Sequence, residues 1–313
     1  MLMIINKSGV FLMALLILSV SQPIMASGGC ETATDLLFRA YHLYRQNSNI
    51  FQQQLLFNRS LQLCPNRPEV HTALASIFER QGKLSQAIYH YQQSVSLKPN
   101  FSPAWAQLGK IFYHENQFPI SLESYLHACQ KDPSSKAQVI ESLKNKRYSF
   151  TNKDQLTEKE SLLVLFNLKR RRNLRKMIED CDLDELGEIS NIEPKHTFFN
   201  LTFDINEAFL PPTAQAQLEE IGGALLEVSE KRVIHIHGHS DHKPFRYANP
   251  NESEKRNQEL SEQRALAVAH AIEEQGIPLT RIKIHSHGNN APLTTEDSPI
   301  ALEKNRRIEI EVK

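Results

Sequence analysis

The stretch Arg232-Val-Ile-His-Ile-His-Gly-His-Ser-Asp241 decides the fold of the C-terminal part of this chain. Ile234 and Ile236 alternate with His235 and His237, and this period of two predicts a β-strand with one apolar and one polar face. A long polar segment follows, and then residues 257–275 carry the pattern of a helix. A strand followed by a helix in this way is half of an α/β unit.

The segments around this stretch extend the same alternation of strands and helices. Proline and glycine separate these segments, and each is short enough to form one element. We therefore expect an α/β sandwich over residues 195–313, with one sheet face buried under two helices. The expected strands are 198–205, 232–239, 281–287 and 306–313, the expected helices are 214–230 and 257–275, and a loop carries Pro292 and Pro299.

The region before this domain has a helical pattern and contains a sequence repeat. Pro65, Pro99 and Pro133 are 34 residues apart, which is the spacing of tetratricopeptide repeats. Small residues such as Gly109 let a partner helix approach, and aromatic residues such as Tyr125 fill the remaining space. The pattern resembles a three-unit tetratricopeptide array with a cap, over residues 34–146. Its positions are Leu37, Ala40, Tyr41, Tyr44 and Phe57 in the first unit, Leu74, Ala75, Phe78, Ala87 and Tyr91 in the second, and Trp105, Leu108, Gly109, Phe112, Tyr125 and Ala128 in the third.

Residues 147–194 are expected to form a helical linker between the two regions. The helical pattern of 156–181 is followed by the acidic segment 182–194, which contains Gly187 and Pro194 and marks the predicted domain boundary. The cations of 169–172, with Arg175 and Lys176, favour a solvated helix face over a nucleic-acid or lipid site, because no aromatic side chains interleave them and the chain is expected to be exported. Lys+Arg and Asp+Glu both number 36, so the overall charge indicates no nucleic-acid partner.

The N-terminus has the plan of a secretory signal peptide over residues 1–26. Lys7 precedes an apolar run over 10–20, and Ala26 stands at the expected cleavage point. Gly29-Cys30 raises a lipoprotein alternative, although Ser27 occupies the position where a lipobox usually has leucine. Export would place the protein in an oxidising compartment, so disulfides are expected.

Four cysteines, Cys30, Cys64, Cys129 and Cys181, allow three pairings, and the sequence does not choose between them. Cys30 with Cys64 would staple the first repeat, and Cys129 with Cys181 would tie the array to the following helix. Buried free thiols are the remaining alternative.

One motif around Asp241 is typical of a metal site. His237-x-His239-x-Asp241-His242 resembles the zinc motif of the metallo-β-lactamase superfamily, whose ligands hold two zinc ions and ionise a bound water. The context argues against that enzyme, because only 71 residues follow His242. A solvated sheet face is the simpler interpretation of the histidines, and incidental binding of zinc or copper by facing imidazoles is a further alternative.

Several separated motifs, in order, resemble the OmpA-like C-terminal domain. The resemblance implies a βαβαββ fold and non-covalent binding of peptidoglycan through the free D-centre of meso-diaminopimelate, without a cofactor, a metal or a catalytic residue. It covers residues 195–313. The matching residues are Ile236 with Gly238-His-Ser-Asp241, Asn257, Leu260, Ser261, Arg264, Ala265 and Val268, Gly276-Ile277, Arg281, Gly288, Pro292, and Asn305-Arg-Arg-Ile-Glu-Ile310.

The same resemblance implies a role for each site residue. Asp241 would take the ammonium of diaminopimelate, and Arg264 would take its carboxylate through the planar guanidinium. Asn257, Arg306 and Ser240 match further contact positions of the family. The alternatives are structural: Asp241 could cap a turn, Asn257 could cap the helix, and Arg264 or Arg306 could form an internal salt bridge.

Asp241 and Arg264 stand 23 residues apart, which is wider than the usual spacing of the family. The surplus lies in residues 242–256, which are polar and contain Pro244 and Pro250. Lengthening a loop costs little stability, so the pocket can survive with a changed rim. The inserted loop could cover the pocket or bind a second partner.

These observations predict an exported adaptor of a Gram-negative periplasm or outer-membrane periphery, which binds peptidoglycan and recruits a protein through its repeats. The alternatives are a protein-binding scaffold with a vestigial wall pocket, and a zinc hydrolase acting through His237, His239, Asp241 and His242. The identity of the repeat partner, the oligomeric state and the envelope process are left open by the sequence.

Overall fold

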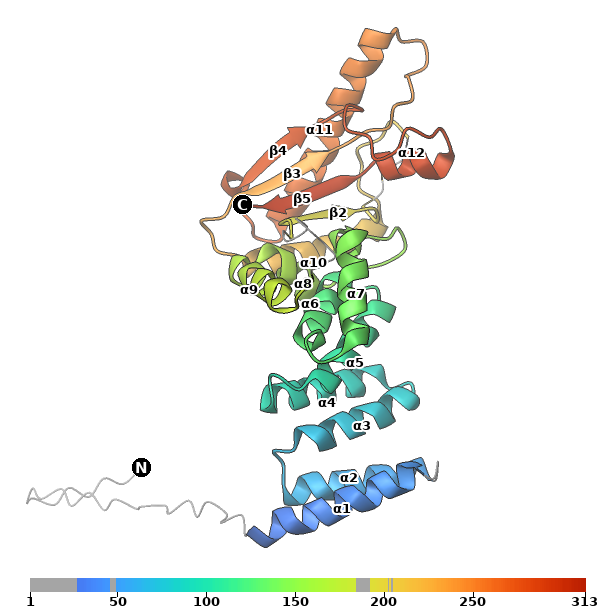
Figure 1. Cartoon of the computed structure of the whole chain (residues 1–313). Helices are drawn as coiled ribbons and strands as arrows, with labels where there is room; N and C mark the ends of the chain where they lie inside the picture. The colour runs from blue at the N-terminus through green and yellow to red at the C-terminus, as the bar shows by residue number, and fades with distance from the viewer. Residues whose placement is uncertain (1–26, 46–48, 184–191, 202, 204) are drawn as a thin grey trace, which may run out of the picture. The chain divides into compact units, whose positions relative to one another are not determined.

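The computed structural model describes residues 27–45, 49–183, 192–201, 203 and 205–313 (Figure 1). The predicted signal peptide, residues 1–26, lies outside the described residues. Contacts divide the chain into two compact units, one that ends at Pro65 and one that begins at Asn66. Within the described residues, no helix combines the length and the apolar character needed to span a membrane.

The first unit is a helical hairpin of α1 (Ser27–Arg45) and α2 (Ile50–Leu63). Asn49 begins α2, because its side chain accepts a hydrogen bond from the amide of Phe51 at 3.0 Å. A disulfide joins Cys30 to Cys64 and closes the hairpin at one end. This is one of the two pairings considered from the sequence.

The second unit starts with two more helical hairpins. They are α3 (Pro68–Arg80) with α4 (Leu84–Leu97), and α5 (Ser102–His114) with α6 (Phe118–Ala128), followed by α7 (Pro133–Lys144). A Cβ atom added to Gly109 would lie 2.7 Å from the ring of Tyr125, so a side chain there would push α5 and α6 apart. These hairpins and this contact confirm the predicted tetratricopeptide-like packing.

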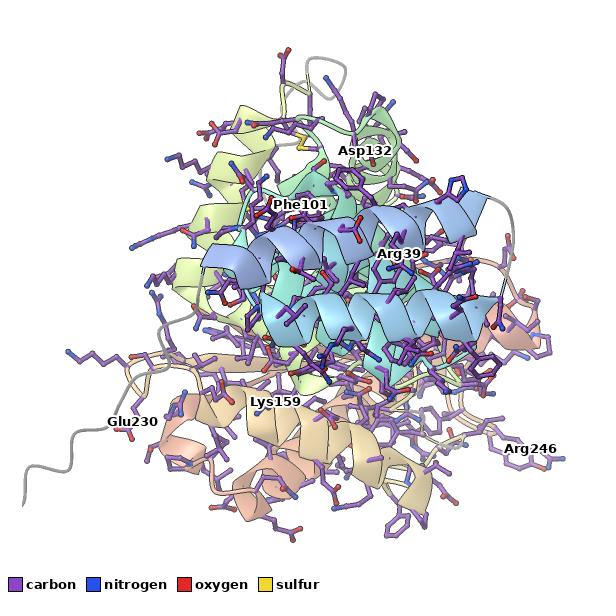
Figure 2. The ribbon with its side chains drawn as sticks, turned by 90° about the horizontal axis from the view of Figure 1, so that it is seen from below. Arg39, Phe101, Asp132, Lys159, Glu230 and Arg246 are labelled. Atoms are coloured by element: carbon purple, nitrogen blue, oxygen red, sulfur yellow. A yellow bond between two sulfur atoms is a disulfide. The ribbon has the colours of Figure 1, made fainter. Side chains whose placement is uncertain are left out.

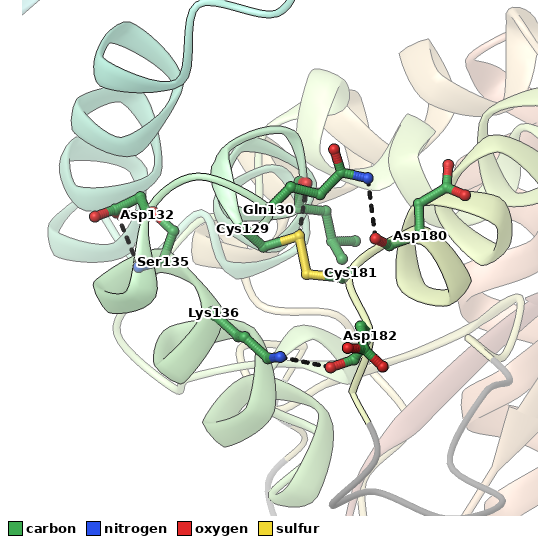
Figure 3. The surroundings of a disulfide bond; sticks show 9 residues. Cys129, Gln130, Asp132, Ser135, Lys136, Asp180, Cys181 and Asp182 are labelled. Atoms are coloured by element: carbon green, nitrogen blue, oxygen red, sulfur yellow. Dashed lines mark hydrogen bonds between the residues drawn. A yellow bond between two sulfur atoms is a disulfide. The ribbon is translucent and has the colours of Figure 1, made fainter.

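After α7 the chain turns toward the sheet through η1 (Arg147–Ser149), β1 (Phe150–Thr151), α8 (Lys159–Phe166) and α9 (Leu168–Asp180). The second disulfide, Cys129–Cys181, links the end of α6 to the end of α9 (Figure 3). Near it, the side chain of Gln130 donates a hydrogen bond to the carbonyl of Asp180 at 2.9 Å. The repeat helices and α9 are therefore tied both covalently and by hydrogen bonding.

The C-terminal sheet has the strand order β1-β2-β5-β3-β4. β3 (Ile234–Gly238) pairs in parallel with β4 (Ile282–Ser286), and β5 (Ile308–Val312) runs antiparallel to both β3 and β2 (Lys195–Phe198). The helices α10 (Gln215–Leu226) and α11 (Pro250–Glu274) share a buried core with one sheet face (Figure 1). The predicted α/β class is confirmed.

Apolar side chains from α6, α8, α10, α11 and the sheet belong to one continuous core. β1 pairs in parallel with β2, and α8 packs against both α6 and α10. Residues 150–181, which the sequence pattern places in a linker, thus contribute strand pairing and buried side chains to the C-terminal domain.

The strand β2 differs from the first strand that the sequence predicts. It covers Lys195–Phe198 rather than 198–205, because β5 begins opposite Phe198 and offers no backbone partner beyond that residue. Leu201 and Phe203 still enter the core, and their burial explains the apolar alternation that suggested a longer strand. The expected loop around Pro299 is also partly helical, since α12 covers Pro299–Asn305.

Candidate functional site

A pocket of about 360 Å³ lies where β3 ends, between α11, α12 and the segment that follows Gly238. The five site residues predicted from the sequence all line it. They are Ser240, Asp241, Asn257, Arg264 and Arg306. Residues far apart in the chain are brought together here by the order of strands and helices.

Gly238 allows α11 to lie directly against β3. A Cβ atom at this position would overlap the carbonyl oxygen of Ser261 and would lie 3.2 Å from the Cβ of Ala265. Because only glycine fits this close approach, Gly238 sets the distance between the strand and the helix that carries Arg264.

The segment after Gly238 is held by backbone hydrogen bonds. The amide of Ser240 donates to the carbonyl of Gly288 at 2.8 Å, and the amide of Gly288 donates to the hydroxyl of Ser261 at 2.9 Å. Gly288 has a φ of 53°, which is a left-handed conformation suited to glycine. Ser240 and Asp241 are therefore placed by fixed backbone rather than by a free loop.

Asp241 and Arg306 form an ion pair in the pocket. The Oδ2 atom of Asp241 lies 2.7 Å from Nη1 of Arg306, and the two side chains are 13% and 15% exposed. Oδ1 of Asp241 accepts a hydrogen bond from the amide of Lys243 at 3.0 Å. Two of the structural alternatives, a turn cap at Asp241 and a salt bridge at Arg306, are thus realised. Each carboxylate oxygen has a second lone pair, so Asp241 can still accept a bond from a ligand ammonium.

Arg264 is fully buried at the base of this site. Its Nε donates to the carbonyl of Glu207 at 2.9 Å, and its guanidinium lies 5.1 Å from the ring centre of Phe203. The pKa of Arg264 is lowered to about 10: burial is the largest cause, the charge of Arg306 also lowers it, and Asp241 acts in the opposite direction. Arg264 remains a cation at neutral pH, and an anion in the pocket would stabilise that charge.

Asn257 lies inside α11 and not at its start. The helix begins at Pro250, and Asn249 caps it by accepting a hydrogen bond from the amide of Glu252 at 2.9 Å. The expected start near residue 257 is therefore wrong, and Asn257 does not cap the helix. Its nearly buried amide side chain lines the pocket instead.

Two buried polar atoms of the pocket residues have no hydrogen-bond partner in the part of the chain that the structure describes. They are Oγ of Ser240 and Nε of Arg306. Ser240 is only 2% exposed, and buried polar atoms are normally hydrogen-bonded. Both atoms belong to side chains that line the pocket.

One wall of the pocket was not predicted as part of the site. Lys243, Pro244, Phe245 and Arg246 form it, and all four belong to the inserted segment 242–256. The second half of that segment is the first part of α11 rather than a loop. The pair Asn249-Pro250 is a helix-start signal that could have shown this from the sequence.

The structure does not arrange the four residues of the zinc-motif alternative as a metal site. His237 pairs with His287 at 2.9 Å, His242 pairs with Asp297 at 2.8 Å, and Asp241 pairs with Arg306. No three His, Cys, Asp or Glu side chains among the described residues are arranged to hold a metal ion. The arrangement expected of a two-zinc hydrolase is not formed by these side chains.

The histidines form a separate cluster on the open face of the sheet. His235 pairs with His285 at 2.8 Å, and the rings of His239 and His287 stack at 4.6 Å. Burial, followed by the neighbouring His285 and His287, lowers the pKa of His237 to about 4. The isoleucines of the same strand are fully buried, which confirms the predicted alternation.

Comparison with known proteins agrees with the fold of the C-terminal domain. Residues 202–306 match the model of the OmpA family, which confirms the OmpA-like character of the C-terminal domain. The sodium-type flagellar protein MotY of Vibrio parahaemolyticus is 25% identical over 185 residues, which is 55% of this chain and 55% of that protein. The tetratricopeptide repeat domain-containing protein PYG7 of Arabidopsis thaliana is 28% identical over 68 residues, which is 22% of this chain and 23% of that protein.

The chain covers between 9% and 55% of the length of the curated relatives that it matches. Among solved structures, the peptidoglycan-associated lipoprotein from Burkholderia pseudomallei is 22% identical, with a TM-score of 0.32. That match covers 36% of this chain and 88% of the other.

Proposed function

We propose that this protein is a non-enzymatic adaptor of the periplasm that binds peptidoglycan through its OmpA-like domain and recruits a protein through its helical repeats. The site is the pocket of Ser240, Asp241, Asn257, Arg264 and Arg306. The ligand is the diaminopimelate of the stem peptide. The protein is exported through a cleaved signal peptide at residues 1–26. It resides at the periphery of the outer membrane.

The convergence of the five residues in one pocket is the observation that carries the proposal. The D-centre of diaminopimelate exposes an ammonium and a carboxylate on one carbon. Asp241 offers an acceptor for the ammonium, and Arg264 offers a fixed cation for the carboxylate. Oγ of Ser240 supplies a further hydrogen-bonding group without a partner among the described residues.

Sedimentation with purified sacculi that contain diaminopimelate tests this function. We expect the mature protein to pellet with the sacculi and to be released by soluble diaminopimelate peptide. Asp241→Asn and Arg264→Gln should each weaken binding by more than about tenfold, because each removes a charge-assisted hydrogen bond.

Lys255→Gln is the matched control, because Lys255 is an exposed residue of the same helix, pairs with Glu259 and does not line the pocket. Thermal melts of all variants separate loss of binding from loss of folding, since Arg264 is itself buried. Equal pelleting of the wild type and the two site variants would reject the proposed site.

The repeats offer a groove for the protein partner. A hollow of about 620 Å³ lies along α5 and α7, lined by polar and aromatic side chains that include Gln107, Lys110, Tyr113 and Gln138. A photo-crosslinker at position 107 or 138 should capture a partner in intact cells, whereas one at exposed Glu254 on α11 should not. Capture of the same set of proteins from all three positions would contradict a specific groove.

A scaffold with a vestigial wall pocket is the second candidate. The ion pair of Asp241 with Arg306 favours it, since the acceptor of the ammonium already has a cationic partner. The two candidates give opposite results in sedimentation with sacculi. The adaptor pellets with them, whereas the scaffold does not pellet although it still crosslinks to a partner through its repeats.

A further inference from the structure

The wall made by the inserted segment carries two cations beside the pocket. Lys243 and Arg246 both line it, and neither has an ion-pair partner among the described residues. Asp241 is the one carboxylate among the lining residues that the structure describes, and it is already paired with Arg306. The wall therefore adds positive charge that nothing described in the pocket balances.

This wall is held in place by hydrogen bonds. The amide of Phe245 donates to the hydroxyl of Ser253 at 3.1 Å, and the amide of Ala248 donates to the carbonyl of Phe245 at 3.2 Å. The amide of Lys243 donates to Asp241 itself. The backbone that carries the two cations therefore stands at a fixed place relative to Asp241, and their exposed side chains extend from it.

Arg246 occupies the outer part of this wall. Its guanidinium lies 5.0 Å from the ring centre of Tyr247, and Tyr247 is 91% exposed. Figure 2 shows Arg246 at the margin of the molecule with its side chain extended away from the ribbon. Lys243 is exposed as well, and its backbone amide donates to Asp241 of the ion pair.

The ammonium and the carboxylate on the D-centre of diaminopimelate cancel each other's charge. Binding of this zwitterionic group therefore leaves Lys243 and Arg246 without a counter-charge. An anion a few ångströms further along the same ligand would be attracted to them. We propose that the wall of Lys243, Pro244, Phe245 and Arg246 forms a second subsite, in which Lys243 and Arg246 bind a second carboxylate of the ligand. This inference rests on the proposed binding of diaminopimelate peptides.

The subsite selects a class of stem peptide. A peptide whose second carboxylate is free should bind more tightly than the same peptide with that group amidated, because amidation removes the charge and leaves the shape almost unchanged. Exposed ion pairs are weak, so two of them together should give a preference of about fivefold. Salt screens such exposed charges, and the preference should shrink at high ionic strength.

Calorimetric titration of the full mature chain with the two soluble diaminopimelate peptides, one free and one amidated, tests the subsite. The wild type should prefer the free peptide about fivefold, and Lys243→Gln with Arg246→Gln should bind both peptides equally. Lys255→Gln should keep the preference, because Lys255 is exposed on α11, pairs with Glu259 and does not line the pocket.

Equal affinity of the wild type for the two peptides would overturn the second subsite while leaving the proposed function intact. A preference that persists in the double variant would also overturn it, because the selectivity would then arise elsewhere in the pocket. Failure of the wild type to bind either peptide would overturn both the subsite and the proposed function.

Discussion

The side-chain oxygen of Thr151 lies 2.8 Å from Nε2 of His196, and both side chains are buried. Thr151 belongs to β1 and His196 to β2, so the bond joins the segment after the repeats to the first strand of the OmpA-like domain. Thr157 also contacts Thr151, and its backbone exchanges two hydrogen bonds with the side chain of Gln217 in α10. Residues 147–181 are therefore part of the C-terminal domain, through β2 and α10.

A fragment that starts at residue 195 should consequently be unstable. It lacks α8, in which every residue from Ser161 to Phe166 is buried, and the core facing this helix would be exposed to water. Burial of an apolar side chain contributes roughly 1.5–3 kcal/mol, so the fragment should lose roughly 5 kcal/mol or more relative to 118–313. Urea unfolding of the two fragments, followed by circular dichroism, measures the difference.

Binding of a hydrophobic dye provides the control. The fragment 118–313 retains α6 to α9 and the Cys129–Cys181 disulfide, so it should unfold cooperatively and bind less dye than 195–313. If 195–313 unfolds with the same midpoint and slope, the helices before it are dispensable and the predicted boundary near residue 194 is the structural one.

The fold of the C-terminal domain could be predicted because its pattern is strongly periodic. Ile234 and Ile236 are buried while His235 and His237 face the other side, and this follows directly from the period of a strand. The site residues could be placed because their motifs occur in a fixed order along that fold. The ion pair of Asp241 could not be predicted from the motif order, because its partner Arg306 is 65 residues further along the chain.

The elements that the sequence pattern missed are those with little periodicity. β1 has two residues, which are too few to show alternation. The start of α11 is polar and solvent-facing, and an ion pair between Glu252 and Arg256 supports it instead of core packing. His196 is buried through a polar network, a situation that hydrophobic patterning does not reveal.

Replacement of Gly238 by alanine should strongly destabilise the domain. The new methyl group would overlap the backbone carbonyl of Ser261, and backbone atoms cannot move aside cheaply. We expect a loss of roughly 3 kcal/mol or more in the free energy of unfolding, together with loss of ligand binding. Gly223→Ala is the matched control, since its methyl group would meet only the flexible side chain of Lys159 at 3.1 Å. Similar melting temperatures for the two variants would contradict the tight contact between β3 and α11.

The Asp241–Arg306 pair should show energetic coupling in a double-mutant cycle. Asp241→Asn leaves a mostly buried guanidinium without its partner, and Arg306→Gln leaves the carboxylate alone, so each should cost about 1–3 kcal/mol. The double variant should lose less than the sum of the two, with a coupling of about 1 kcal/mol. Strictly additive losses in urea unfolding would mean that the pair contributes no net stability.

Removal of the Cys129–Cys181 disulfide should destabilise the link between the repeats and α9. The bond closes a segment with a sequence separation of 52, and a cross-link of this size typically contributes about 2–4 kcal/mol. Cys129→Ser with Cys181→Ser should lower the melting temperature of the fragment 118–313, and reduction of the wild-type fragment should reproduce the effect. The same reductant should leave the double variant unchanged; a further shift would show that the effect is not due to this bond.

Stability should fall as the pH drops from about 7 toward 5. Burial lowers the pKa of His196 to about 3, and the pKa of His237 is lowered to about 4 by burial and then by its histidine neighbours. In the unfolded chain both titrate near the ordinary value of about 6.5, so between these limits the unfolded state binds more protons than the folded state. Stability is therefore full above the unfolded pKa and is lost as the pH falls toward the folded pKa.

Each of these two imidazoles should lower the free energy of unfolding by about 1.4 kcal/mol at pH 5.5 relative to pH 7.5. Urea unfolding at several pH values measures the slope, and His196→Gln should reduce it even if the variant is less stable at neutral pH. His270→Gln is the control, because His270 lies on the exposed side of α11, next to Glu273. If His196→Gln leaves the slope of stability against pH unchanged, the acid sensitivity arises from the histidine pairs on the open sheet face. In that case His237→Gln should reduce the slope.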